Sequence, residues 1–299
     1  MKKTQDRHSD LEYRLEIARN IFQSQPYIDY EFFKTDDLLI LTSAKIGTSF
    51  IKTYLKSNHI KFIEGSFKYL IDEDFWSEDN STNEPIGINN IMSNPDIRKL
   101  ILFRNPRIKV LSGVLQDFNG AMVTLGNSII GRRLFQDKYE IPEEMFAMMD
   151  GYRDFDLEIL MDNHPDIMER IFVDFFILGI KDNNLLYQHS KLVSKNIYWL
   201  LESGKIKLGE NDSVIDIDTH GQDVITVLKD VYQDKVQVHH DKSYYNSNIS
   251  EYFIYESPLW NELAMRDTPW FRTMENRINT DWLFYDLMKQ KWQRAIIKK

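Results

Sequence analysis

The stretch LLILTSAKIGTSFIK, residues 38–52, runs from an apolar segment through a short polar turn into a pattern typical of a helix. The apolar segment has the length of a strand and no polar alternation, which favours a strand buried on both faces of a parallel sheet. Turns between such a strand and a helix often hold phosphate groups. The usual spelling G-x-x-x-x-G-K-S/T is absent, because Lys45 precedes Gly47 instead of following it. The stretch therefore predicts an anion site of another kind.

Further strand and helix patterns alternate along the chain. Residues 60–65 and 98–104 have the character of two more short strands, and residues 105–118 follow as a helix. Residues 213–232 have the pattern of a strand followed by a helix. This alternation is the signature of an α/β sheet with right-handed crossovers. We therefore expect an α/β fold of three layers, with a parallel sheet flanked by helices.

Residues 119–180 interrupt this alternation, because their apolar residues follow a helical pattern with little strand signal. We interpret this segment as a helical insertion that caps the sheet. The chain contains no internal repeat, low-complexity tract or clear linker. The sequence therefore predicts a single domain over residues 1–299, with the helical cap at about 119–180.

The composition excludes several classes of protein. The chain has 299 residues, 42% hydrophobic and 28% charged, which is ordinary for a globular protein. It has no uninterrupted apolar run of about 18 residues and no apolar segment of a secretory signal near its start, so we expect a cytoplasmic protein without a membrane span. The absence of cysteine excludes disulfides and thiolate sites. The net charge of −9 argues against nucleic acid as a partner.

The turn after the first predicted strand carries the first group of candidate binding residues. Gly47 allows the backbone to approach an anion closely. The amides of Gly47, Thr48 and Ser49 open a helix, where unpaired N–H groups and the helix dipole favour negative charge. Lys45 supplies a compact positive charge. The alternative is an ordinary strand–turn–helix corner with a solvated lysine.

The end of the strand at 98–104 carries the second group. Arg104 lies where the strand exits, and a guanidinium there can hold a phosphate bidentately. Ser112 follows eight residues later, about two helical turns on, where its hydroxyl can reach the same anion. Ligands of open α/β sheets bind beyond the carboxyl ends of the strands, which is where both groups are expected. The alternative is an arginine paired with a surface carboxylate and a serine that only packs.

Taken together, the two motifs resemble those of the sulfotransferases that use 3'-phosphoadenosine 5'-phosphosulfate (PAPS), in particular the carbohydrate sulfotransferases. The segment SAKIGTSFIK, 43–52, is similar to the family motif P-K-x-G-T-T/S, which holds the 5'-phosphosulfate. The segment RNPRIKVLS, 104–112, is similar to R-D-P-x-x-R-x-x-S, which holds the 3'-phosphate, with Asn105 in place of the acid. The resemblance implies a P-loop-like sulfotransferase fold in which PAPS is bound by Lys45, Gly47, Thr48, Ser49, Arg104 and Ser112.

The resemblance continues more faintly downstream. Residues 171–195 resemble a phenylalanine-rich segment followed by the histidine motif D-x-H-x-x-P-Q, with His189 as the histidine but without the proline and the glutamine. Residues 239–248 resemble a late loop that reads N-K-S, in which Lys242 would touch the nucleotide. Family members that act on sugars often place a glutamate near the end of the second strand, where this chain has Glu64. The resemblance thus implies Lys45, Glu64 and His189 as catalytic candidates, the last two as alternatives for the general base.

These features predict transfer of a sulfuryl group from PAPS to a hydroxyl or amine of a carbohydrate or another small molecule. A sulfuryl group carries less negative charge than a terminal phosphoryl group, so a lysine and several N–H donors can stabilise the transition state without a metal. Phosphoryl transfer uses magnesium held by carboxylates, and no such signature follows the turn. Two alternatives stay open: a small-molecule kinase with a degenerate P-loop, and a nucleotide-binding protein without catalytic activity. The sequence does not identify the acceptor.

Overall fold

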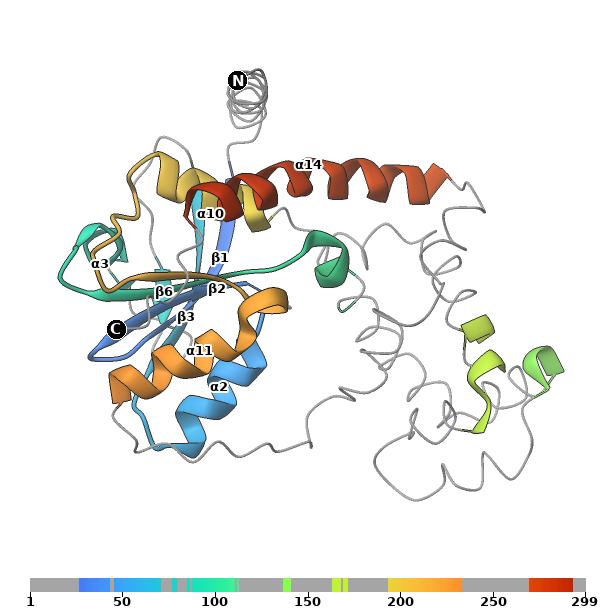
Figure 1. Cartoon of the computed structure of the whole chain (residues 1–299), viewed down its shortest axis with the longest axis horizontal. Helices are drawn as coiled ribbons and strands as arrows, with labels where there is room; N and C mark the ends of the chain where they lie inside the picture. Colours follow the sequence, from blue (N-terminus) through green and yellow to red (C-terminus); the bar gives the residue numbers. More distant parts are fainter. Residues whose placement is uncertain are drawn as a thin grey trace, which may run out of the picture. The chain divides into compact units, whose positions relative to one another are not determined.

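The computed structural model describes residues 27–43, 46–70, 77–79, 85–86, 88–110, 112, 137–140, 163–167, 169–171, 193–232 and 269–292 (Figure 1). The chain divides into two compact units. The first comprises Met1–Pro106, Leu192–His239 and Arg277–Lys299, and the second comprises Arg107–Lys191 and His240–Asn276. The first unit contains the sheet and is described below.

The sheet of the first unit has seven strands in the order β5-β4-β3-β1-β2-β6-β7. Strands β2, β6 and β7, at one end of this order, run parallel, and every other neighbouring pair is antiparallel. The strands are β1 Tyr27–Lys34, β2 Leu38–Thr42, β3 Ile63–Leu70, β4 Ser77–Asp79, β5 Pro85–Ile86, β6 Arg98–Phe103 and β7 Ser213–Asp216. The predicted α/β class is therefore confirmed, but the prediction of a parallel sheet is wrong for the half that contains β1.

Strand β1 makes the sheet mixed, and the sequence patterns did not predict it. It lies between β2 and β3 and pairs antiparallel with both. Only three residues separate it from β2, and a parallel pairing would require a crossover of a dozen residues or more. Thr35 closes the short turn, because its hydroxyl accepts a hydrogen bond from the Leu38 N–H at 3.0 Å and its own N–H donates to the Leu38 carbonyl at 2.9 Å.

Helices lie on both faces of the sheet. Helices α2, Thr48–Ser57, and α11, Ile217–Tyr232, cover one face, while α10, Val193–Glu202, and the C-terminal part of α14, Pro269–Lys291, cover the other (Figure 1). The short helix α3, Ile88–Ser93, precedes β6. The helix predicted after the polar turn and the strand–helix pair predicted at 213–232 are thus confirmed. Among the described residues, none of the helices has the length and apolar character needed to cross a membrane.

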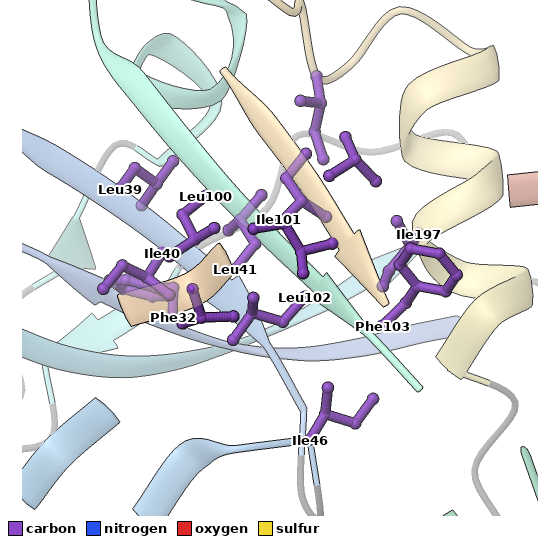
Figure 2. Close-up of a cluster of buried hydrophobic side chains, with 14 of the residues drawn as sticks. Phe32, Leu39, Ile40, Leu41, Ile46, Leu100, Ile101, Leu102, Phe103 and Ile197 are labelled. Carbon is purple, nitrogen blue, oxygen red and sulfur yellow. The ribbon is translucent and has the colours of Figure 1, made fainter. Parts of the chain in front are cut away.

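Burial explains why the apolar runs form the centre of the sheet. Every residue of β2 is buried, and so is every residue of β6 after Arg98. Their apolar side chains enter one hydrophobic cluster with those of the neighbouring helices, as Figure 2 shows for Phe32, Leu39, Ile40, Leu41, Ile46, Leu100, Ile101, Leu102, Phe103 and Ile197. This confirms the burial predicted for β2 on both faces, and β6 is buried in the same way.

Only parts of the predicted helical segments are described. After β6, residues 106–110 and 112 are helical, in agreement with the helix predicted at 105–118. Within the predicted cap at about 119–180, the described helical residues are 137–139, 163, 165–167 and 169–171. The rest of the cap lies outside the described residues.

A buried ion pair holds the amino end of β6. The Lys99 side chain is fully buried, and its Nζ lies 2.7 Å and 2.8 Å from the carbonyl oxygens of Asn94 and Ile97. Asp212 Oδ2 is 3.4 Å from the same nitrogen and accepts the Gly209 N–H at 2.8 Å, while its Oδ1 accepts the Lys99 N–H at 2.7 Å. The Asp212 carboxylate therefore links β6 to the loop that precedes β7.

Candidate anion-binding site

The turn between β2 and α2 has the geometry of an anion-binding corner. The Ile46 N–H donates to the Ser43 carbonyl at 2.9 Å, and Gly47 follows in the left-handed conformation with φ 75° and ψ 9°. Among the described residues, the neighbour that a Cβ at Gly47 would meet is Leu102 Cδ1, at an ordinary 3.8 Å, so the backbone angle and not a lack of space favours glycine. Within the described part of the chain, no side chain caps α2 and no acid lies in its first turn. The first amides of α2 therefore point outward from a helix end that favours negative charge.

Thr48, the first residue of α2, connects this turn to strand β1. Its hydroxyl lies 2.9 Å from the Ser43 carbonyl oxygen and 3.2 Å from Glu31 Oε2. Glu31 pairs with Thr42, the last residue of β2, so its carboxylate lies at the carboxyl edge of the parallel strands. A carboxylate here opposes the binding of an anion but is suited to accept a proton.

Arg104 follows the end of β6 and is held by a carboxylate from the neighbouring strand–helix junction. Its Nε lies 2.9 Å from Asp218 Oδ1, and the Asn105 N–H donates to Asp218 Oδ2 at 2.9 Å. The side chains of Arg104 and Asp218 are only 17% and 8% exposed. Burial raises the pKa of the Asp218 carboxyl, while the Arg104 guanidinium and the Asn105 N–H act in the opposite direction.

Gly47 of the first predicted motif and Arg104 of the second follow strands that end at one edge of the sheet. Strands β2 and β6 are parallel neighbours, with Leu41 opposite Ile101, so the turn at Gly47 and the turn at Arg104 leave adjacent strands at their carboxyl ends. This is the edge at which open α/β sheets bind their ligands. Four of the predicted binding residues that the structure describes belong to the first unit: Gly47, Thr48, Ser49 and Arg104.

Other predicted site residues are placed differently or are not described. Glu64 is the second residue of β3 instead of the end of a strand, and its Oε2 pairs with Lys52 Nζ at 2.5 Å. Ser112 is helical and belongs to the second unit, so its place in the Arg104 site stays a prediction. Lys45, His189 and Lys242 lie outside the described residues.

The register of the sheet shows how far Glu31 and Glu64 each lie from the carboxyl edge of the parallel strands. Glu31 is opposite both Thr42 on β2 and Ser66 on β3, whereas Glu64 is opposite Phe33, two positions further from the carboxyl edge. Two strand residues span about 6.5 Å. Glu31, which sequence reasoning missed, is therefore the carboxylate that contacts the first turn of α2. In the sequence, Glu31 is visible only as an acid in an aromatic-rich stretch. This pattern does not show which residues of the neighbouring strands lie opposite Glu31.

A polar network lies behind Asp218. The Asp216 side chain is fully buried, its Oδ1 accepts the Asp218 N–H at 3.2 Å, and its Oδ2 accepts hydrogen bonds from Tyr285 Oη at 2.6 Å and Thr219 Oγ1 at 2.8 Å. Lys289 Nζ lies 3.4 Å from the same carboxylate oxygen. The start of α11 is thus fastened to α14.

A buried lysine occupies the first turn of α10. Lys195 is 3% exposed, and its N–H donates to Asp281 Oδ1 on α14 at 3.1 Å. Burial lowers the pKa of the Lys195 ammonium to about 8, against the opposing effect of the Asp281 carboxylate. The folded protein therefore releases this proton at a lower pH than the unfolded chain, whose lysine has a pKa of 10.5.

This difference predicts how stability changes with pH. Between about pH 8 and 10.5 the unfolded chain binds a proton that the folded protein has lost, so the contribution of Lys195 to stability rises with pH. We expect the wild type to gain up to about 1.4 kcal/mol per pH unit relative to Lys195→Met over this range. Urea denaturation of both proteins at several pH values measures the gain, with Lys56→Met on the exposed end of α2 as a control. A difference that is independent of pH would contradict the assignment.

In the described ranges, no group of three or more His, Asp or Glu side chains is arranged to hold a metal ion. The geometry at the carboxyl edge instead combines a helix N-terminus, a hydroxyl, an arginine and a carboxylate. Comparison with family models, with curated proteins and with solved structures found no match to this chain.

Proposed function

We propose that this chain is a sulfotransferase that uses PAPS as its donor. The observation that supports the proposal best is the meeting of the two motifs on neighbouring parallel strands, β2 and β6. A nucleotide with phosphates at both its 5' and 3' ends requires two separate anion sites near one another. The α2 N-terminus at Gly47 suits one phosphate, and the Arg104 guanidinium suits the other.

In the proposed reaction, an oxygen or nitrogen of the acceptor attacks the sulfur in line with the bond to the 5'-phosphate. The new bond to sulfur forms as the sulfur–oxygen bond to the phosphate breaks, and 3'-phosphoadenosine 5'-phosphate leaves. Lys45 and the amides of Thr48 and Ser49 would stabilise the charge that grows on the leaving oxygen. The acceptor proton passes to a base, for which Glu31 joins Glu64 and His189 as a candidate. The acceptor class we propose is a carbohydrate or another small molecule.

The first test is selective binding of the donor nucleotide. We expect 3'-phosphoadenosine 5'-phosphate to raise the melting temperature, and ATP much less, because only the former presents a 3'-phosphate to Arg104. A ligand at a hundredfold excess over its Kd adds about 2.7 kcal/mol to stability. Arg104→Ala should remove most of the difference between the two nucleotides. Equal shifts with both nucleotides would argue against a dedicated 3'-phosphate site.

Transfer itself is tested with a donor labelled in its sulfuryl group, offered to a panel of glycans and small alcohols. A labelled product that forms in the presence of EDTA supports sulfuryl transfer without a metal. Product formation from ATP that depends on magnesium would instead identify a kinase. Nucleotide binding without release of 3'-phosphoadenosine 5'-phosphate, with any acceptor on the panel, would indicate a protein that binds and does not catalyse.

A further inference from the structure

We infer that Asp218 is a positioning residue, which orients Arg104 for the 3'-phosphate of the nucleotide. This inference rests on the proposed function. Asp218 does not resemble any part of the two motifs, and it follows Arg104 by 114 residues in the sequence. Its role therefore emerges only from the folded arrangement at the carboxyl edge of the sheet.

The contact geometry favours orientation over simple charge pairing. A guanidinium has two usable edges, one that includes Nε and one formed by Nη1 and Nη2. Asp218 Oδ1 takes the Nε edge at 2.9 Å, while Asp218 Oδ2 is committed to the Asn105 N–H at 2.9 Å. The carboxylate thus fixes both the side chain of Arg104 and the backbone that follows it. A phosphate bound by the Nη edge would meet a guanidinium of fixed direction.

Asp218 is itself held in place from behind. Its N–H donates to Asp216 Oδ1, and Asp216 is fully buried beneath Tyr285, Thr219 and Lys289. The Asp218 side chain is only 8% exposed and its backbone is held in place. It can therefore contact Arg104 in only a few conformations of the arginine side chain. The conformational entropy of the long Arg104 side chain is therefore lost during folding and not during ligand binding, which favours affinity.

Asp218 has two opposing effects on the affinity of Arg104 for a phosphate. Its negative charge weakens the attraction between Arg104 and a phosphate, so its removal would tighten binding if charge dominated. Its orienting contact means that the Arg104 side chain is already ordered before the ligand binds. The entropy cost avoided in this way corresponds to roughly 3- to 10-fold in affinity. Because the pair is largely buried and its geometry is good, we expect orientation to dominate. Asp218→Asn should then weaken binding of the 3'-phosphate.

The experiment measures the Kd of 3'-phosphoadenosine 5'-phosphate and of adenosine 5'-phosphate, which differ only in the 3'-phosphate. Asp218→Asn should reduce the ratio of the two affinities by roughly 3- to 10-fold. A general loosening of the fold would weaken both nucleotides and leave the ratio unchanged. The matched control is Asp230→Asn, since Asp230 Oδ2 accepts from Arg98 Nη1 at 2.7 Å and joins the opposite ends of β6 and α11. This control should preserve the ratio.

A second variant covers the case in which Asp218→Asn does not fold. Arg104→Lys keeps the charge but lacks a second edge that Asp218 can hold, so it should lose most of the preference for the 3'-phosphate. A wild-type ratio in Arg104→Lys, or an unchanged or increased ratio in Asp218→Asn, would overturn the positioning role. If the wild type itself shows no preference for the 3'-phosphate, the proposed function fails and this inference fails with it. If Arg104→Ala loses the preference and Asp218→Asn keeps it, only the inference fails.

Discussion

Lys45→Ala is expected to lower kcat by about 100-fold or more while changing the Kd of 3'-phosphoadenosine 5'-phosphate only slightly. In the sequence, Lys45 stands between Ser43 and left-handed Gly47. In the proposed reaction, charge develops beside this turn when the bond to the leaving 5'-phosphate breaks. An interaction that strengthens in the transition state affects kcat, whereas one that is equal in both states affects affinity alone. Single-turnover kinetics with saturating donor, using an acceptor found in the product screen, separate the two quantities.

The control for this experiment is Lys56→Ala, which removes an exposed lysine from the last turn of α2, the helix that follows Gly47. It should leave kcat and Kd close to those of the wild type. An increased KM in Lys45→Ala with an unchanged kcat would show that Lys45 only binds the donor. Its role in the proposed transition state would then be wrong.

Asp212→Ala is expected to destabilise the fold by about 3–5 kcal/mol, because it leaves a buried lysine without its carboxylate. Lys99 is fully buried, and Asp212 accepts both the Lys99 N–H and the Gly209 N–H. The alanine removes one charge and leaves these donors without their acceptor. Equilibrium urea denaturation gives the change in the free energy of unfolding.

The control for Asp212→Ala is Asp230→Ala, which breaks the exposed ion pair between Asp230 and Arg98, the residue before Lys99 on β6. Exposed pairs contribute about 0–1 kcal/mol, so this variant should be nearly as stable as the wild type. The double variant Lys99→Met with Asp212→Asn should recover part of the loss, since no buried charge then remains. A loss below about 1 kcal/mol in Asp212→Ala would mean that the carbonyls of Asn94 and Ile97 alone suffice for Lys99.

The local features of the fold could be predicted from the sequence because they depend on neighbouring residues. The apolar runs of β2 and β6 are buried on two faces, so every position is apolar except Lys99 and the strand ends, and the pattern is visible. The glycine in the turn is visible because few other residues adopt a left-handed conformation. These signals were enough to place the two candidate turns at the carboxyl ends of strands, and the structure adds that the two strands are neighbours.

Partners that are distant in the sequence could not be predicted in this way. The contact of Glu31 with Thr48 depends on the antiparallel register of β1, which no local pattern specifies. The pairing of Arg104 with Asp218 joins residues that are far apart in the chain. The buried Lys99 would be assigned to the surface by its charge alone. In each case the contacts of the polar side chain depend on the folded structure and not on the spacing of residues in the sequence.

The chain leaves the first unit after Pro106 and returns to it at Leu192, so that the whole of Arg107–Lys191 forms a single excursion between β6 and α10. Closing such an excursion costs entropy that grows only with the logarithm of its length, and a doubling adds about 0.6 kcal/mol. The pairing of β6 with β7 is therefore almost insensitive to how many residues the excursion contains. The length of this segment can therefore change while the turns at Gly47 and Arg104, which are anchored on strands outside it, keep their geometry.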